Sequence, residues 1–250
     1  MSATNGQTLD PELRFSLVVP IHNEVENIDS LLGEIEMVLA PVGPFEVLLM
    51  DDASSDGSRK AMDAWKREHD ADWLRILCLD RQSGQSGALL AGLEKTRANL
   101  VCTMDGDMQN DPRDLIPMLE ALQDTDVAGV TGVRANRKDT FVRRVSSRIG
   151  NFVRNTVTSD HVTDSACGIK MFRRDYWLMV PRFNGMHRFM PTLVRYAGGD
   201  VLEIPVNHRP RVAGKAKYGI GNRAMRGFKD CLAVRWYRSR LLQYRVKEER

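Results

Sequence analysis

Short runs rich in apolar and β-branched residues alternate with segments of helical periodicity through the first half of the chain. Buried strands are predicted for five of these runs: Phe15–Val19, Glu46–Met50, Leu74–Leu79, Leu100–Met104 and Val127–Val133. Apolar residues recur three and four positions apart from Ile28 to Leu39 and again from Leu115 to Leu122, which predicts a helix in each place. Alternating strands and helices favour an α/β fold, with a mostly parallel sheet and helices on both faces.

The second half of the chain has a different composition. Residues 141–157 form a basic amphipathic stretch, and Val201–Val206 has the pattern of a further strand. Residues 218–250 mix apolar and aromatic side chains with many arginines, as an amphipathic helical tail does. Because neither a low-complexity linker nor an internal repeat interrupts the chain, we expect a flexible N-terminus (1–13), one α/β domain (14–217) and this basic tail (218–250).

The overall composition, 42% hydrophobic and 28% charged, is that of a soluble globular protein. No run approaches the roughly 20 apolar residues that a spanning helix needs, and the polar N-terminus lacks the features of a secretory signal. The four cysteines show no paired spacing; Cys78 and Cys102 lie in strand-like runs and are expected to be buried. A reducing cytoplasm fits this composition better than a disulfide framework or a zinc site does.

The net charge of +3 conceals an asymmetry. From Arg209 onward, thirteen Lys and Arg residues stand against three acids, so this segment carries +10 and the remainder about −7. A basic block of this kind indicates an anionic partner: a phosphate, a nucleic acid or a membrane surface. The alternative is a helix whose charges are merely solvated.

Polar clusters follow three of the predicted strands. They are Pro20–Glu24 after the first strand, Asp51–Ser58 after the second and Asp105–Gln109 after the fourth. Each alone could consist of turn formers or helix caps. The carboxyl ends of parallel strands share one edge of a sheet, however, and that edge is where such sheets bind ligands. Acidic groups gathered there favour a bound cation, which offsets their repulsion.

The third cluster has the chemistry of a site for a hard cation. Asp105 and Asp107 flank a glycine, so both carboxylates can turn toward one ion, and Gln109 adds a neutral oxygen. Oxygen ligands without histidine or thiolate suit Mg²⁺ or Mn²⁺ rather than zinc. An ion held by so few protein groups completes its shell with substrate phosphates, and a diphosphate leaving group fits this requirement.

These segments resemble glycosyltransferase family 2, whose members have the GT-A fold. The resemblance rests on VVPIHNEVENI (18–28), LMDDASSDGS (49–58) and MDGDMQNDP (104–112), the last containing a DxD-like element. More narrowly, the chain resembles the polyprenyl-phosphate sugar synthases, a group that includes dolichol-phosphate mannose synthase and bacterial undecaprenyl-phosphate sugar transferases. Residues 164–173 and the GKAKY segment (214–218) resemble further elements of that group, although Ala216 replaces the usual serine.

The resemblance implies a role for each matched position. Binding of the nucleotide-sugar is implied for Pro20, Glu24, Asp51, Asp105, Arg211 and Lys217. Metal binding is implied for Asp105, Asp107 and Gln109, and binding of the acceptor phosphate for Arg134, Arg143 and Arg144. The catalytic positions are Asp107, Asp164 and Lys217. A lipid monophosphate has a second pKa of about 6, so it is already a nucleophile at neutral pH. We therefore expect Asp164 mainly to orient the basic residues or the sugar, with base catalysis as a secondary role.

The resulting hypothesis is an inverting transfer from a UDP- or GDP-linked sugar to a polyprenyl phosphate. The enzyme is expected to be peripheral at the cytoplasmic face, with its tail on an anionic membrane surface; an integral membrane partner and a homo-oligomer are compatible with this, and nucleic acid is not an expected partner. One alternative keeps the donor chemistry but has a saccharide acceptor in cell-surface polysaccharide synthesis. Another is a non-catalytic nucleotide-sugar-binding module.

Overall fold

The computed structural model describes residues 8–135, 141–210 and 220–242, without the side chains of residues 141–149, 220–224 and 226. The chain divides into two units, which we describe separately. The larger contains the described residues of Met1–Lys138 and Thr163–Ala216, and the smaller those of Asp139–Val162 and Lys217–Arg250. Residues 139–162, which the sequence analysis assigned to the α/β domain, thus group with the C-terminal segment.

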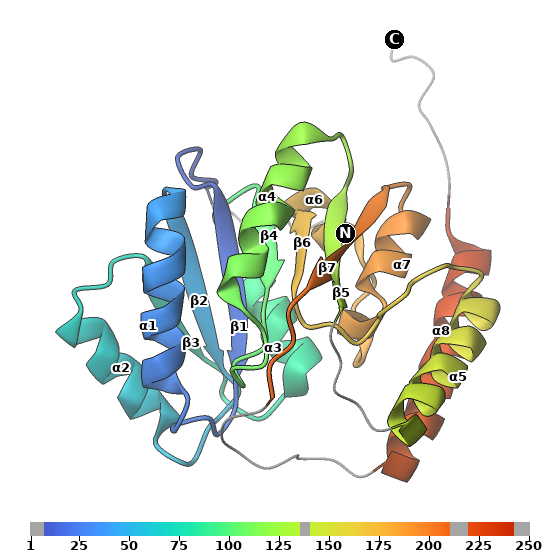
Figure 1. The fold of residues 1–250 in the computed structure, drawn as a ribbon, viewed down its shortest axis with the longest axis horizontal. Coiled ribbons are helices and arrows are strands. Elements are labelled where there is room, and N and C mark those ends of the chain that lie inside the picture. The colour runs from blue at the N-terminus through green and yellow to red at the C-terminus, as the bar shows by residue number, and fades with distance from the viewer. Residues whose placement is uncertain (1–7, 136–140, 211–219, 243–250) are drawn as a thin grey trace. The chain divides into compact units, whose positions relative to one another are not determined.

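A seven-stranded sheet organises the larger unit, in the order β3-β2-β1-β4-β6-β5-β7 (Figure 1). Its strands are β1 (Phe15–Ile21), β2 (Phe45–Asp51), β3 (Leu74–Cys78), β4 (Leu100–Thr103), β5 (Gly129–Arg134), β6 (Lys170–Arg173) and β7 (Val201–Val206). All pairings are parallel except those of β6, which is antiparallel to both β4 and β5. The mostly parallel sheet of the predicted α/β fold is therefore confirmed.

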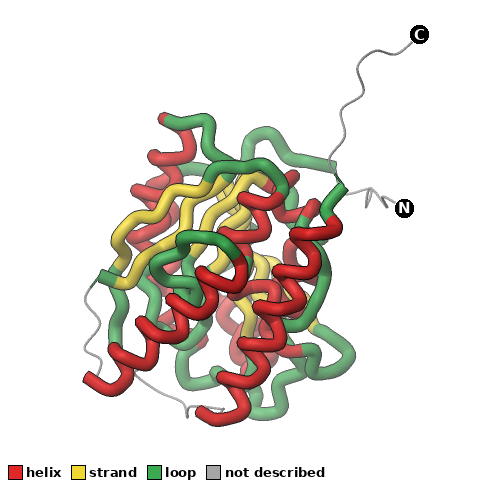
Figure 2. Tube along the Cα trace, turned by 90° about the vertical axis from the view of Figure 1, so that its right-hand side faces the viewer, coloured by secondary structure: helices red, strands yellow, loops and turns green. Residues whose placement is uncertain are grey.

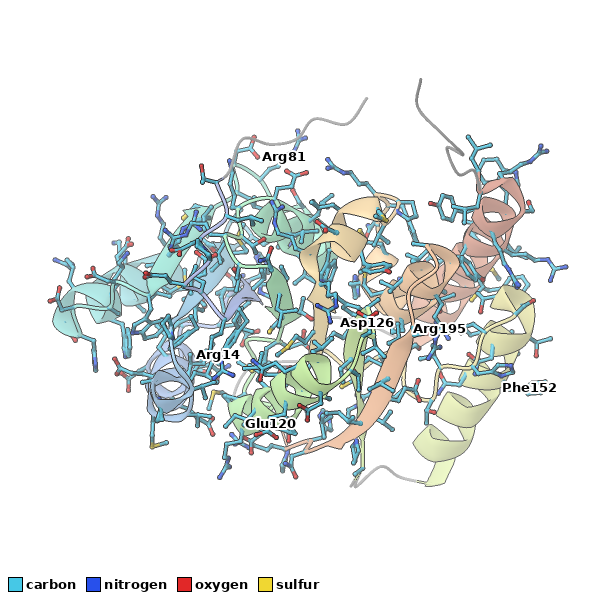
Figure 3. All side chains as sticks on the ribbon, turned by 90° about the horizontal axis from the view of Figure 1, so that it is seen from above. Arg14, Arg81, Glu120, Asp126, Phe152 and Arg195 are labelled. Atoms are coloured by element: carbon cyan, nitrogen blue, oxygen red, sulfur yellow. The ribbon has the colours of Figure 1, made fainter. Side chains whose placement is uncertain are left out.

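Helices cover both faces of this sheet. They are α1 (Ile28–Leu39), α2 (Ser58–Glu68), α3 (Gly84–Leu93), α4 (Leu115–Asp124), α6 (Arg174–Met179) and α7 (Met190–Tyr196), with 3₁₀ turns η1 (Ala40–Val42), η2 (Pro112–Asp114) and η3 (Met186–Arg188). Figure 3 shows α4, which carries Glu120, on one side of the sheet, and the loop before α3, which carries Arg81, on the other.

The core follows from strand periodicity, because successive side chains of a strand point to opposite faces. Leu17 and Val19 of β1 are fully buried in the cluster that also contains the apolar residues of α1, α2 and α4. Val18, between them, faces α3, where Gly92 lies so close that a Cβ there would be 2.5 Å from its Cγ1. A two-sided core of this kind fixes the register of β1 and hence the place where its polar loop begins.

Two local expectations differ from the structure. Strand β6 was not predicted, because it has only four residues and begins and ends with a basic one, Lys170 and Arg173. The prediction that Cys78 is buried is wrong: this residue ends the edge strand β3 and is exposed, whereas Cys102, in the inner strand β4, is buried. An edge strand leaves one flank uncovered, so an apolar run on it does not guarantee burial.

In the smaller unit, α5 (Phe141–Thr158) and α8 (Ile220–Arg240) lie side by side, as Figures 1 and 2 both show. Arg235 of α8 donates to the carbonyl of Val157, at 3.3 Å, and Arg238 donates to the carbonyls of Thr158 and Ser159, each at 3.4 Å. These guanidinium groups satisfy carbonyls that the end of α5 leaves without helical partners. Across the described residues, no helix is both long and apolar enough to span a bilayer.

Candidate active site

The loops after β1, β2 and β4 leave the sheet at one edge, the lower edge in Figure 1. Each contains a non-glycine residue with positive φ: Asn23 at 53°, Ala53 at 55° and Met108 at 62°. Such a conformation costs about 1 kcal/mol or more for a residue with a Cβ, and strained backbone of this kind concentrates at functional sites. Three of the five non-glycine residues with positive φ in the described part of the chain thus lie in the loops that the sequence analysis identified as candidate site segments; the other two are Asp70 and Ser159.

The first turn of α3 closes this edge. Asp52 accepts hydrogen bonds from the backbone N–H groups of Ser83, at 2.6 Å, and Gly84, at 2.8 Å. A carboxylate at a helix N-terminus satisfies N–H groups that have no helical partner and interacts favourably with the helix dipole. Asp52 therefore fixes the position of α3, and with it that of Gln85, whose side chain reaches the third cluster.

Asp105 is held from several directions. Its Oδ1 accepts a hydrogen bond from Nε2 of Gln85, at 2.7 Å, and its backbone N–H donates to Oδ1 of Asn110, at 3.1 Å. Gly168, in the segment before β6, leaves room for this carboxylate, because a Cβ at Gly168 would lie only 2.2 Å from its Oδ2. Thr103 donates from Oγ1 to the Gly168 carbonyl, at 2.8 Å, and thereby keeps that glycine in place.

Asp107 and Gln109 complete the oxygen-bearing cluster. The Gln109 N–H donates to Oδ1 of Asp107, at 3.3 Å, and the Gln109 side-chain amide donates from Nε2 to the carbonyl of Arg209, at 3.3 Å. The second bond identifies the nitrogen branch of the amide, so Oε1 is the branch that a cation can use. Two carboxylates and an amide oxygen fit a hard divalent cation whose other ligands come from water or phosphate. Among the described residues, no group of three or more His, Cys, Asp and Glu side chains forms a metal site.

A bidentate ion pair joins the last residue of β5 to the beginning of the segment that precedes β6. Arg134 donates from Nε to Oδ2 of Asp164, at 2.6 Å, and from Nη2 to Oδ1, at 2.7 Å. Both side chains are largely buried, at 12% and 7% exposure, and Ala166 donates its N–H to Oδ1 of Asp164. A carboxylate with both oxygens engaged in this way organises its surroundings better than it accepts a proton.

Comparison with known proteins identifies the chain. The sequence model described as Glycosyl transferase family 2 matches residues 16–177, which is more than half of the chain. The chain belongs to glycosyl transferase family 2. It is 35% identical to a dodecaprenyl-phosphate galacturonate synthase from Rhizobium johnstonii in an alignment 237 residues long, which covers 92% of this glycosyltransferase and 69% of that protein. It is 34% identical to an undecaprenyl-phosphate 4-deoxy-4-formamido-L-arabinose transferase from Salmonella paratyphi B over 84% of its own length and 64% of the relative's.

Solved structures show the same fold. A mannosyltransferase from Pyrobaculum calidifontis, solved with GDP-Man and Mn²⁺, superposes with a TM-score of 0.61 at 21% identity, covering 92% of this chain and 72% of that one. Glucosyl-3-phosphoglycerate synthase from Mycobacterium tuberculosis, in complex with Mn²⁺, UDP and glucosyl-3-phosphoglycerate, superposes with a TM-score of 0.66 at 16% identity, covering 95% of this chain and 82% of that one. The GT-A expectation for the glycosyltransferase is thereby confirmed.

Three more of the predicted donor-binding residues, Pro20, Glu24 and Asp51, lie at the same edge. Pro20, near the end of β1, lies beyond the last β1–β4 pair, so its missing N–H interrupts no bond of that ladder. Glu24 accepts from the Asn27 side chain, at 2.7 Å, and the buried Asp51 accepts from the Ser54 N–H, at 3.0 Å. Binding roles for these side chains stay predictions. Arg211 and Lys217 lie outside the described residues, as do the side chains of Arg143 and Arg144.

The segment that leads toward Arg211 is nevertheless anchored. Arg209 donates to both carboxylate oxygens of Glu34, at 2.7 and 2.6 Å, and lies 2.7 Å from Oδ2 of the buried Asp111. Burial raises the pKa of Asp111, but hydrogen bonds from Arg113 and Arg209 outweigh it and lower the pKa to about 2. The chain after β7 therefore leaves the sheet from a fixed point beside Gln109, whose carbonyl accepts from the Arg209 N–H at 2.9 Å.

Sequence reasoning missed a buried histidine and serine near this site. Ser86, one residue after Gln85, lies 2.6 Å from Nδ1 of His187 and accepts from the Gly185 N–H, at 2.8 Å. Burial, together with the charges of Lys170 and Arg188, lowers the pKa of His187 to about 3. The ring is therefore neutral, and its Nδ1 shares a hydrogen bond with the Ser86 hydroxyl. No sequence motif joins the two residues, which are 101 positions apart.

Proposed function

We propose that this glycosyltransferase transfers a sugar from a nucleotide-sugar donor to a polyprenyl phosphate, with inversion at the anomeric carbon. The observation that carries the proposal is the bidentate pairing of Asp164 with Arg134, which engages both oxygens of this carboxylate. A sugar hydroxyl needs a base to become a nucleophile, whereas a phosphate monoester does not. The names of the two relatives, both of which act on a polyprenyl phosphate, support the same acceptor.

At the donor end, Asp105, Asp107 and Gln109 are the residues that would hold Mg²⁺ or Mn²⁺. The ion supplies stabilisation of the negative charge on the departing diphosphate. The chain's own contribution is to fix its ligands, through the Gln85 hydrogen bond to Asp105 and the space beside Gly168. The sequence-based assignments of Lys217 and Arg211 to the diphosphate, and of Pro20, Glu24 and Asp51 to the nucleoside, belong to this proposal.

At the acceptor end, a phosphate oxygen attacks the anomeric carbon as the bond from that carbon to the diphosphate oxygen breaks. One carbon–oxygen bond forms and one breaks, and no proton has to be removed from the dianionic phosphate. Arg134, with Arg143 and Arg144, is proposed to bind this acceptor phosphate. Asp164 fixes the direction of the Arg134 guanidinium, so its catalytic contribution is positioning.

The membrane-bound acceptor calls for a surface that meets a bilayer. Four exposed apolar residues recur at intervals of three and four along α8: Met225, Phe228, Leu232 and Trp236, with exposures of 61, 45, 47 and 64%. Exposed basic residues, among them Lys229 and Arg235, lie on the same helix. We propose that this stripe inserts between the headgroups of an anionic membrane at its cytoplasmic face, where the free cysteines of the chain stay reduced.

Transfer is tested with the purified full-length chain, Mn²⁺ or Mg²⁺, a panel of UDP- and GDP-sugars and undecaprenyl phosphate. The expected result is a lipid-linked sugar that requires metal and falls at least about 100-fold in Asp107→Asn. Asp63→Asn, which changes an exposed aspartate on α2, is the matched control and should act like the parent. Transfer to saccharides but not to the lipid phosphate would refute the acceptor, and donor binding without metal-dependent turnover would favour a binding module.

Membrane attachment is tested separately by vesicle flotation. Wild-type protein should float with vesicles containing phosphatidylglycerol and remain below with phosphatidylcholine alone. The variant Leu232→Glu/Trp236→Glu should lose flotation, while Met37→Glu, at a residue 71% exposed on α1, should retain it. Undiminished flotation of the double variant would exclude α8 as the membrane contact.

A further inference from the structure

Lys170 lies at the centre of a polar row that crosses the sheet. It is the first residue of β6 and pairs with Thr103 of β4 on one side and with Thr131 of β5 on the other. Directly paired residues of neighbouring strands point to the same face. Asp105 follows Thr103 by two residues and Arg134 follows Thr131 by three, so Lys170 stands between the strand that leads to the donor cluster and the strand that leads to the acceptor pair.

The lysine is buried as well as central. Only 4% of the residue is exposed, and its ammonium group donates to the carbonyl of Cys167. Burial lowers the pKa of Lys170, whereas the charges of Asp105 and Asp164 act to raise it. A lysine is almost never buried to this extent unless charged or polar groups surround it. Here the acidic groups come from both sides of the site.

We propose that Lys170 is a positioning residue that holds the metal-binding carboxylate Asp105 and the acceptor-organising pair Asp164–Arg134 in a fixed relation to each other. The segment between Asp164 and Lys170 supports this role at each step. It contains Gly168, which leaves room for the Asp105 carboxylate, and Cys167, whose carbonyl receives the Lys170 ammonium. A displaced ammonium group would therefore shift the loop 164–170, and with it both the space for Asp105 and the position of Asp164.

A purely structural lysine makes a different prediction. An apolar side chain of similar length fills the same space, and whatever the loss of one buried charged partner costs the free energy of unfolding is measured separately by a urea titration. If Lys170 served only to fill the core, Lys170→Met would retain the wild-type Mn²⁺ affinity and the wild-type ratio of transfer to hydrolysis. The proposed role requires both to change while the fold remains.

The first readout is Mn²⁺ affinity, measured by calorimetry or by electron paramagnetic resonance without donor or acceptor. Removing a positive charge near a cation site should by itself tighten Mn²⁺ binding. Loss of the positioning of Asp105 should instead weaken it, and we expect a Kd at least about threefold higher in Lys170→Met. Lys170→Gln, which can still donate to the Cys167 carbonyl, should lie between this variant and the parent. The exposed Lys60→Met on α2 is the matched control.

The second readout rests on the proposed function and compares two reactions of the donor. Metal-dependent hydrolysis by water needs only the donor side, whereas transfer to polyprenyl phosphate needs both sides. We expect the ratio of transfer to hydrolysis to fall at least about tenfold in Lys170→Met. If the wild-type protein binds Mn²⁺ but transfers the sugar to another acceptor, the proposed function is wrong, and the role of Lys170 is then tested by the Mn²⁺ affinity alone. Unchanged or tighter Mn²⁺ binding in both folded Lys170 variants would overturn the inference.

Discussion

Substitution of Gly168 by alanine places a methyl group in the space that the Asp105 carboxylate occupies. The new Cβ would lie 2.2 Å from Oδ2, 2.6 Å from Cγ and 3.0 Å from Oδ1 of Asp105. The φ of Gly168 is not in the left-handed region, so the backbone accepts alanine without strain of its own. The conflict is therefore confined to one side chain, the one assigned to the metal.

The size of the effect follows from these distances. A carbon and an oxygen that are not bonded approach to roughly 3.2 Å, so the Asp105 carboxylate has to move by about 1 Å or rotate away from Gln85, which now bonds to its Oδ1. A misplacement of about 1 Å near reacting groups costs on the order of 100-fold in rate. The fold loses less than about 3 kcal/mol, because the end of a side chain moves more easily than packed core atoms do.

The assay measures Mn²⁺ affinity, metal-dependent turnover of the donor and unfolding in urea for the same preparation. Gly168→Ala should bind Mn²⁺ at least about tenfold more weakly and turn over about 100-fold more slowly. The matched control is Gly33→Ala on α1, where no atom lies within 4 Å of the added methyl group and stability should rise by up to about 1 kcal/mol. Wild-type Mn²⁺ binding in folded Gly168→Ala would show that Asp105 does not hold the metal.

Three further predictions concern stability. The pKa of His187 is lowered to about 3 in the folded protein, so as the pH falls below about 6.5 this histidine is protonated in the unfolded chain first. The free energy of unfolding should therefore drop by about 2 kcal/mol between pH 7 and pH 5. Urea titrations of wild type and His187→Asn at both pH values test this, and an equal drop in the two proteins would contradict it. Glu46→Gln should lower the free energy of unfolding by about 3 kcal/mol, because Arg75 and Arg97 then lack the buried carboxylate that they share. An unchanged urea midpoint would mean that water takes the place of this carboxylate. Arg209→Ala should cost about 2 kcal/mol through the loss of its bonds to Glu34, and a variant as stable as wild type in thermal unfolding would refute the anchoring of this segment.

The proposed donor half of the candidate site could be located from the sequence because its signals are local. Each of the three polar loops directly follows an apolar strand, and parallel strands bring their carboxyl ends to one edge whatever their order. Asp105, Asp107 and Gln109 thus follow from residues that lie next to each other in the sequence. The support of Asp105 by Gln85 and Gly168 could not be predicted in the same way, since it depends on where α3 and the segment before β6 pack.

The proposed acceptor half depends on pairings that no short motif encodes. Arg134 and Asp164 are 30 residues apart and meet because β6 runs antiparallel between β4 and β5. Four residues with a basic side chain at each end do not form an apolar run, so β6 was missed, and a buried Lys170 contradicts the usual preference of lysine for water. The grouping of residues 139–162 with the C-terminal helix is likewise a tertiary fact, invisible to periodicity.

The reversed direction of β6 also divides the large unit into two blocks with one shared seam. Strands β1 to β4 come from a single stretch of sequence, residues 15–103, and meet the later strands in the sheet only through the four residue pairs between β4 and β6. Within the sheet, the later block has to match the first block only along this short ladder, whereas contacts outside the sheet, such as those of Arg209 with Glu34 and of His187 with Ser86, also join the two blocks. On the proposed assignment of Arg134 and Asp164 to the acceptor, we expect a change of acceptor to require substitutions mainly in the later block.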